Sequence, residues 1–133
     1  MRILLFGATG MIGQGVLREC LRDPAVEAVL SVARAPSGAS HPKLRDLVHA
    51  DFLDYSAIEA ELKGWDACLW CLGVTSAGMD ESGYARITVA FPVAAATALA
   101  RLNPRMTFVY VSGAGADGTV TSSVMWARVK GSA

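Results

Sequence analysis

Short apolar runs alternate along this chain with longer segments in which apolar residues recur every three or four positions. Continuous apolar runs are typical of strands buried on both faces of a parallel sheet, and the longer pattern is typical of helices. The expected strands cover about residues 2–7, 28–33, 47–49, 67–72 and 107–112. The expected helices cover about residues 11–22, 55–63, 83–102 and a short segment from 122. This order predicts an α/β fold, a doubly wound parallel sheet of about five strands with helices on both faces.

Polar residues, glycine and proline mark several expected boundaries. A loop rich in Ser, Gly and Pro follows the second strand. Asp54 is expected to cap the 55–63 helix, and Gly64 is expected to end it. Pro92 removes one backbone donor from the 83–102 helix and should bend it.

Three glycines, Gly7, Gly10 and Gly13, stand between the first strand and the first helix. Gly7 would permit a tight turn, Gly10 would let a pyrophosphate approach the backbone, and Gly13 would let the helix pack closely on the strand. The N-terminus of the helix offers unpaired N–H groups and the positive end of its dipole to phosphates. The alternative is a glycine-rich turn without a ligand, for which fewer glycines would serve. The spacing therefore predicts a dinucleotide-binding turn.

Size and charge exclude several other classes of protein. The 133 residues are expected to form one domain with its own core. Twelve basic and twelve acidic residues cancel, so the sequence has no electrostatic signature of a nucleic-acid or anionic-membrane partner. The longest uncharged stretch, residues 87–100, is shorter than a membrane span, and the apolar N-terminal run is too short for a signal peptide. We expect a cytoplasmic protein.

Cys68 and Cys71 have the C-x-x-C spacing of some redox and zinc sites. In the expected strand, residues three apart point to opposite faces with Cα atoms about 10 Å apart. That separation is beyond the reach of a disulfide. A second cysteine pair is missing, and the histidines lie in another segment. We therefore expect reduced core cysteines and no metal site.

Several motifs together resemble the short-chain dehydrogenase/reductase superfamily. They are the glycine motif of residues 7–13, Asp51 after the third strand, the Cys-Leu-Gly sequence at 71–73 and the segment 109–117. The resemblance is greatest to the atypical and extended branch of NAD-dependent epimerase/dehydratase-like proteins. The segment 125–131 resembles a signature of small bacterial members of that branch. This resemblance implies a Rossmann-type domain over residues 1–133 that binds NAD(P).

The resemblance also implies a role for individual residues. It places Thr9, Gly10, Met11 and Ile12 on the pyrophosphate of the cofactor. It places Asp51 and Phe52 beside the adenine, Leu72 and Gly73 beneath the adenosine and the nicotinamide-side ribose, and Lys130 on that ribose. Local chemistry offers alternatives, because Asp51 could simply cap a turn and Gly73 could simply end a strand.

Arg34 stands at the end of the second strand, about 20 residues after the glycines. Sites that prefer NAD place a carboxylate there to bind the ribose 2′-hydroxyl. A guanidinium can instead bind a 2′-phosphate through forked, charged hydrogen bonds. We therefore expect NADP as the preferred cofactor, with NAD possible. The alternative is a solvated loop arginine.

The catalytic pattern of the resembled superfamily is incomplete in this chain. Its active members use a Ser or Thr after strand five, a Tyr, and a Lys four residues after that Tyr. Ser112 and Lys130 match the serine and the lysine, but Trp126 occupies the tyrosine position. An indole has no usable acid–base chemistry and cannot replace a phenol. We therefore expect the usual tyrosine-based hydride transfer to be absent.

The long helix has an apolar face that could pack in either of two ways. Its residues are Ile87, Phe91, Ala94, Ala95, Ala98 and Leu102. This face could cover its own sheet, or it could form the homodimer that the resemblance implies.

Two functions fit these observations. One is an NADP-dependent reductase or epimerase that acts on a small molecule, and the other is a dinucleotide-responsive regulator without catalysis. A third interpretation is a fragment that folds only as a dimer. Because so little chain follows the helical segment 124–130, we expect the C-terminal substrate-binding part to be missing.

Overall fold

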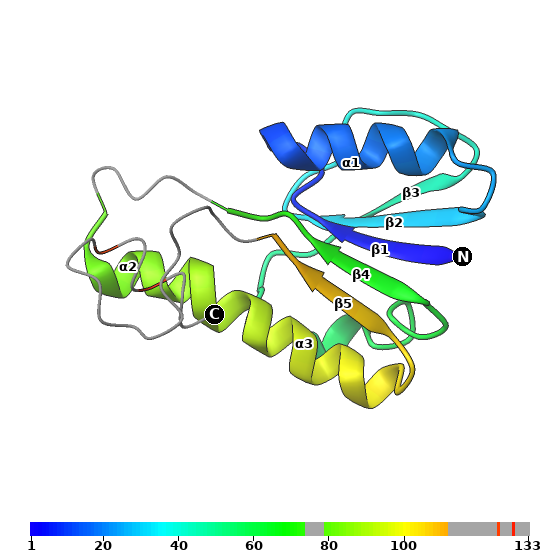
Figure 1. Ribbon diagram of the computed structural model, residues 1–133. Coiled ribbons are helices and arrows are strands. Elements are labelled where there is room, and N and C mark those ends of the chain that lie inside the picture. Colours follow the sequence, from blue (N-terminus) through cyan, green and yellow to red (C-terminus); the bar gives the residue numbers. More distant parts are fainter. Residues whose placement is uncertain (74–78, 112–124, 126–128, 130–133) are drawn as a thin grey trace.

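A five-stranded parallel sheet forms the centre of the protein, in a computed structural model that describes residues 1–73, 79–111, 125 and 129 (Figure 1). The strands follow the spatial order β3-β2-β1-β4-β5. Their bounds are Arg2–Phe6 for β1, Ala28–Ala33 for β2, Leu44–Val48 for β3, Ala67–Trp70 for β4 and Thr107–Tyr110 for β5. This is the predicted doubly wound sheet, with the strand order reversing at β1.

Helices cover both faces of this sheet, as predicted. Helix α1 (Met11–Arg22) lies on one face (Figure 1). The opposite face carries a short 3-10 helix, η1 (Ser56–Ile58), and a continuous helical stretch. That stretch consists of α2 (Glu81–Ala85), the π-helical turn η2 (Arg86–Ala90) and α3 (Phe91–Leu102).

The central strand β1 divides its side chains between two cores. Leu4 and Phe6 face α3, and the Phe6 ring stacks on Trp70 with centroids 4.6 Å apart. Ile3 and Leu5 face α1 on the other side. The two cores exist because neighbouring residues of a strand point to opposite faces of its sheet.

The helix predicted over residues 55–63 is wrong. The structure has only η1 there, followed by turns held mainly by bonds to the third residue back, such as Glu61 N–H to the Ile58 carbonyl at 3.1 Å. The tertiary structure overrides the local pattern, because the side chain of Asn103 binds three backbone groups at the end of this segment. Its Oδ1 accepts from Gly64 and Trp65 at 2.8 and 3.2 Å, and its Nδ2 donates to the Leu62 carbonyl at 2.8 Å.

The third strand is longer than predicted and begins at Leu44 rather than Leu47. The added N-terminal part of the strand contains the charged residues Arg45 and Asp46. Strand β3 lies at the edge of the sheet and is only partly buried. Edge strands tolerate charged side chains, so the charges did not prevent pairing with β2.

The long helix starts earlier than predicted, at Glu81, because the Asp80 carboxylate accepts the Gly83 N–H at 2.7 Å as an N-cap. By length and composition the 22 residues Glu81–Leu102 could cross a membrane. The uncharged stretch 87–100 is shorter than this helix and did not show it. In the fold this helix covers the sheet, and Ala95 and Leu99 belong to the core.

The apolar face predicted on the long helix covers its own sheet. Phe91, Ala94, Ala98 and Leu102 pack against the core that contains Ala95. Of the two expected uses of this face, covering the sheet and forming a homodimer, the structure shows the first.

Two further predictions fall near the C-terminal end of the chain. Strands β4 and β5 each end two residues earlier than predicted, at Trp70 and Tyr110. Ser112 lies outside the described residues. In the predicted helix from 122, Met125 and Val129 are helical and Val129 is buried.

The cysteines of the C-x-x-C sequence face opposite sides of the sheet, as predicted. Cys68 belongs to the core beneath α3, and Cys71 packs against the core beneath α1. Both are free thiols. Burial raises the pKa of each thiol, which disfavours the reactive thiolate.

Candidate nucleotide-binding site

Two of the three glycines are required by the protein's own packing. Gly7 has φ +85°, and a Cβ there would lie 2.5 Å from the Leu72 backbone nitrogen. A Cβ on Gly13 would lie 1.7 Å from the Gly7 carbonyl oxygen. Gly7 therefore makes the turn beside the end of β4, and Gly13 lets α1 approach that turn, as the sequence predicted.

Gly10 differs from the other two glycines. Its backbone is extended, with φ −74° and ψ 171°, a conformation that any residue adopts. A Cβ there would meet only the Gly7 carbonyl oxygen, at the ordinary contact distance of 3.6 Å. Among the described residues, therefore, nothing in the protein's packing requires a glycine at this position.

The N-terminus of α1 is suited to an anion. Its first turn contains no acidic residue, and the N-cap Gly10 has no side chain to bind the free N–H groups. The Gln14 side chain donates to the Thr9 carbonyl at 2.8 Å and thereby fixes the turn. Met11 and Ile12 are exposed, at 91% and 51%, so two apolar side chains stand in solvent beside this helix end.

A cavity of about 160 Å³ brings several predicted site residues together. It is lined by Gly7, Thr9, the end of β2 with Arg34, Phe52 and Leu72. Dinucleotides in doubly wound sheets bind outside the carboxyl ends of the strands at the switch in strand order, which is where this cavity lies. Its volume is smaller than a typical ligand pocket, so it can enclose only one part of a dinucleotide.

Arg34, which lines this cavity, is exposed at the end of β2. Two other predicted residues lie at or near the same edge of the sheet, and of these Gly73 is exposed beyond β4. Asp51 is exposed as well, and its Oδ1 accepts the Leu53 N–H at 3.0 Å. This bond is the local turn cap that the sequence left open as the alternative for Asp51.

His49 holds the turn that carries Asp51 and Phe52, and sequence reasoning missed it. Its Nε2 lies 2.7 Å from the Asp51 carbonyl oxygen and 2.8 Å from the Asp54 carbonyl oxygen. Because both partners are acceptors, Nε2 must carry the hydrogen and donate to them. The ring also lies against Tyr55, with centroids 5.3 Å apart. A lone histidine at the end of the expected strand 47–49 gave no pattern that would have predicted this role.

The residues predicted for catalysis cannot be compared with the structure, because Ser112, Trp126 and Lys130 lie outside the described residues. Among described tyrosines, Tyr110 is half-buried and its hydroxyl donates to the Thr88 carbonyl at 3.2 Å. Burial raises the pKa of Tyr110, which makes it a poor proton donor or base at neutral pH.

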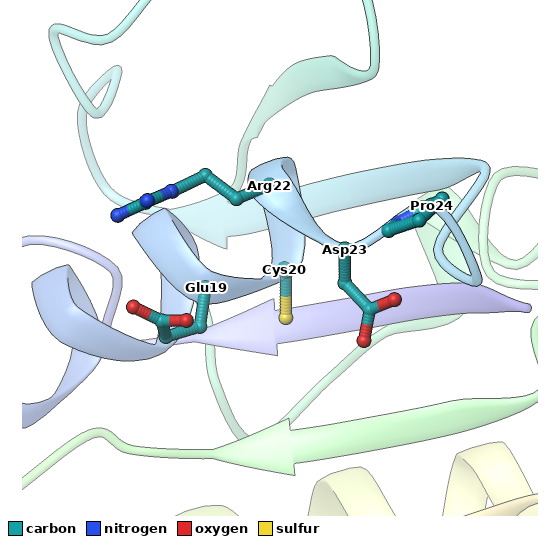
Figure 2. A pocket seen from close by; sticks show the side chains of 5 residues that line it. All are labelled: Glu19, Cys20, Arg22, Asp23 and Pro24. Carbon is teal, nitrogen blue, oxygen red and sulfur yellow. The ribbon is translucent and has the colours of Figure 1, made fainter.

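A second cavity, at the C-terminal end of α1, is larger but chemically unsuited to catalysis (Figure 2). Figure 2 shows the Cys20 thiol pointing toward the sheet, with the carboxylates of Glu19 and Asp23 on the same side of the helix. Burial and these two carboxylates raise the pKa of Cys20, so its thiolate is disfavoured. Among the residues that the structure describes, no three metal-ligating side chains lie together, at this cavity or elsewhere.

Comparison with known proteins identifies the family. Residues 7–131 match the family model described as NAD(P)H-binding, and the chain belongs to this family. The chain is 31% identical to the leucinostatins biosynthesis cluster protein T of Purpureocillium lilacinum over 122 residues, which cover 90% of this chain and 45% of the relative.

Two solved structures show the same fold. The dTDP-glucose 4,6-dehydratase DesIV of Streptomyces venezuelae, with NAD bound, has TM-score 0.76 and 22% identity over 99% of this chain and 49% of its own. The uronate dehydrogenase of Agrobacterium tumefaciens, as the Y136A mutant with NAD, has TM-score 0.68 and 23% identity over 86% of this chain and 42% of its own.

These findings confirm the predicted Rossmann-type fold and NAD(P) binding as the property of the family. The chain is an NAD(P)H-binding domain, and its fold is that of the two solved enzymes. It spans about half the length of the curated relatives that it matches.

Proposed function

We propose that the turn between β1 and α1 binds the pyrophosphate of NADP, with Thr9, Gly10, Met11 and Ile12 around it. The supporting observation is Gly10, whose backbone tolerates a side chain and whose surroundings leave room for one. The described packing does not require a glycine at this position, and the helix N-terminus is uncapped and has no acidic residue. This arrangement suits a phosphate that approaches the backbone closely.

The replacement Gly10→Ser tests this proposal. Serine is a favoured N-cap residue, so the variant should fold with unchanged or higher stability. Its Cβ and hydroxyl would occupy the space of the phosphates, and the affinity for NADP should fall by about tenfold or more, equivalent to ~1.4 kcal/mol. Calorimetric titration with NADP measures the affinity, and thermal unfolding measures the stability.

Gly15→Ser is the matched control. Gly15 is exposed on the same helix, and a Cβ there would meet nothing within 4 Å. This variant should bind NADP as the wild type does. Equal NADP affinities of the wild type and Gly10→Ser, or equal losses in both variants, would contradict the proposal.

The cavity beside Phe52 and Leu72 would hold the adenosine half of the cofactor. Phe52 is in the core and contacts Phe6 and Phe91 edge to face, so it supplies a fixed apolar wall. Asp51, at the same turn, would accept the exocyclic amine of the adenine. Leu72 and Gly73 would lie beneath the adenosine and the nicotinamide-side ribose. We propose NADP rather than NAD because Arg34 lines this cavity where an NAD site would carry a carboxylate.

For catalysis we propose that the chain lacks the usual tyrosine-based step, because Trp126 occupies the position of the acid. Ser112 and Lys130 would then remain as polar neighbours of the cofactor. A regulator that responds to the dinucleotide is the alternative to a reductase or epimerase. Loss of NADPH absorbance at 340 nm with a panel of simple carbonyl substrates tests this. We expect no turnover above the rate without protein, and steady consumption would contradict the proposal.

We also propose that the protein has a small-molecule substrate, forms a homodimer and lies in the cytoplasm. The helical face expected for a homodimer is partly used by the protein's own core. A dimer would therefore use the outer side of α3, where Val93 is 52% exposed. Sedimentation of the wild type and of Val93→Glu would test this surface. If the dimer forms through the outer side of α3, the variant should dissociate into monomers.

A further inference from the structure

A groove runs along one side of α1, beside the connection between β2 and β3. Residues 34–43 form this connection without a helix, although crossovers between parallel strands usually contain one. Figure 1 shows the connection passing alongside α1. The cavity between them has a volume of about 440 Å³. This volume lies within the range of small-molecule sites.

The groove has apolar walls. Leu17 is buried and Leu21 is half-buried on the side of α1, and Ala8 and Ala39 contribute two methyl groups. Such a surface can bury the apolar part of a ligand, at about 25 cal/mol for each Å² removed from water.

Two arginines give the groove its charge. Arg18 and Arg22 are exposed, lie one helical turn apart and both line the cavity. In the residues that the structure describes, the ion pairs within 4.0 Å are Met1–Glu27 and Arg101–Glu59, so neither groove arginine is neutralised by a carboxylate.

The nearby carboxylates face elsewhere or are engaged. Asp46 accepts hydrogen bonds from the backbone N–H and the hydroxyl of Ser37, at 3.1 and 3.2 Å. Glu19 and Asp23 line the neighbouring cavity at the end of α1 (Figure 2), which Arg22 also lines, but neither carboxylate forms an ion pair with Arg22 within 4.0 Å. The groove therefore keeps a net positive charge.

The charged and ring groups that the groove walls leave for a ligand are donors. The Gln14 amide donates to the Thr9 carbonyl, and the Ser37 hydroxyl donates to Asp46. His41 Nδ1 accepts from the Lys43 N–H at 3.1 Å, so the neutral ring carries its hydrogen on Nε2. Two guanidinium groups and one imidazole N–H thus line an apolar cavity.

We propose that this groove is a second binding site, for a small carboxylate with an apolar body. The carboxylate would pair with Arg18 and Arg22, and the body would lie against Leu17 and Leu21. Thr9 lines both this groove and the dinucleotide cavity, so the two ligands would be neighbours. The site does not depend on the proposed dinucleotide binding.

Three small molecules used as probes distinguish binding to the arginines from binding to the apolar walls. Calorimetry would compare 4-phenylbutyrate with 4-phenylbutan-1-ol, which lacks the charge, and with butyrate, which lacks the ring. We expect 4-phenylbutyrate to bind at least about tenfold more tightly than either, because only it satisfies both the arginines and the apolar walls. Binding of the alcohol or of butyrate with equal affinity would overturn the proposal, as would no binding of 4-phenylbutyrate.

Charge-removing variants locate the site. Arg18→Gln combined with Arg22→Gln should weaken 4-phenylbutyrate binding by about tenfold. Arg45→Gln removes one arginine charge from the exposed edge strand β3 and should have no effect. Arg34→Gln removes a charge from the dinucleotide cavity and should also have no effect. A loss in Arg34→Gln with none in the double variant would place the anion in the dinucleotide cavity and overturn the proposal.

Discussion

The hydroxyl of Tyr110 donates to the carbonyl of Thr88 at 3.2 Å, and this bond joins the last described strand to the long helix. Thr88 stands four residues before Pro92, where an α-helix would supply a backbone N–H that proline lacks. The helix here forms the π turn η2, in which the Phe91 N–H bonds to the Arg86 carbonyl. The sequence predicted a bend at Pro92, and the structure has a π turn directly before this residue. The Tyr110 hydroxyl donates to the carbonyl for which proline has no N–H.

Tyr110→Phe should lower the free energy of unfolding by about 1–3 kcal/mol, because it leaves a buried carbonyl without this donor. Tyr55→Phe is the matched control. The Tyr55 hydroxyl is buried without a hydrogen-bond partner among the described residues, so its removal should cost nothing or stabilise the fold. Urea unfolding of both variants measures the difference. A larger loss in Tyr55→Phe than in Tyr110→Phe would contradict this account.

Alkaline pH should destabilise the fold. Burial raises the pKa of Cys68 and of Tyr55 above the values of the unfolded chain. The unfolded chain therefore loses these protons first, and stability falls as pH rises from about 8.5, where unfolded cysteine ionises. Urea unfolding at pH 7, 9 and 10 should show this decline, with a smaller slope in Cys68→Ala. A free energy of unfolding that rises over this range would refute the prediction.

Asn103→Ala should be strongly destabilising, by about 3 kcal/mol or more, because three backbone groups at Leu62, Gly64 and Trp65 lose their partners at once. Asn103→Asp keeps the acceptor that binds two of them and should recover part of the loss. Chemical unfolding would rank the wild type above the aspartate variant and the alanine variant last. Similar stability of alanine and wild type would show that water replaces the side chain.

His49→Phe should loosen the turn of Asp51 and Phe52, because phenylalanine keeps the ring beside Tyr55 but donates no hydrogen bond. We expect a loss of about 1 kcal/mol in stability and weaker binding of adenosine-containing ligands such as AMP. His49→Gln places a donor near the position of Nε2 and should restore both. Calorimetry with AMP and thermal unfolding measure the two effects. A glutamine variant as impaired as the phenylalanine variant would refute this role.

Arg34→Asp should reverse the cofactor preference toward NAD. The change replaces a partner of the 2′-phosphate by a partner of the ribose hydroxyl and adds repulsion of like charges. The ratio of NADP to NAD affinity should fall by about tenfold or more. Arg45→Asp, an equal change of charge on β3, should leave the ratio as it is. An unchanged ratio of NADP to NAD affinity in Arg34→Asp would show that this arginine does not determine the cofactor preference.

Local sequence predicted those elements whose signals agree with their tertiary environment. Strand β2 has the predicted bounds, since an apolar run between turn residues is buried on both faces. Helix α1 has them as well, because it begins directly after the glycine turn and ends before Asp23. The 55–63 helix failed because Asn103, 39 residues from Gly64, binds the backbone of that segment. A contact between such distant residues leaves no periodic pattern in either segment.

The candidate site was predictable only where the residue type itself carries the chemistry. Gly7 and Gly13 could be assigned because only glycine fits a positive φ or a close backbone approach. The role of His49 depends on the orientation of two backbone carbonyl groups, which no sequence pattern predicts. The groove beside α1 was not predicted either, since it arises from the path of a connection rather than from a motif.

The position of β1 at the centre of the sheet has a consequence for synthesis on the ribosome. Of the five strands this one is made before the others, but its neighbour β4 follows much later, and the bond from the Arg2 N–H to Asp66 spans 64 residues. Strands β1, β2 and β3 with α1 can assemble as soon as they emerge. Until residue 67 appears, the other edge of β1 has no pairing partner, and Leu4 and Phe6 have only part of their core. The nascent chain therefore passes through a stage with a bare apolar strand edge, where chaperone binding and misassembly compete with folding.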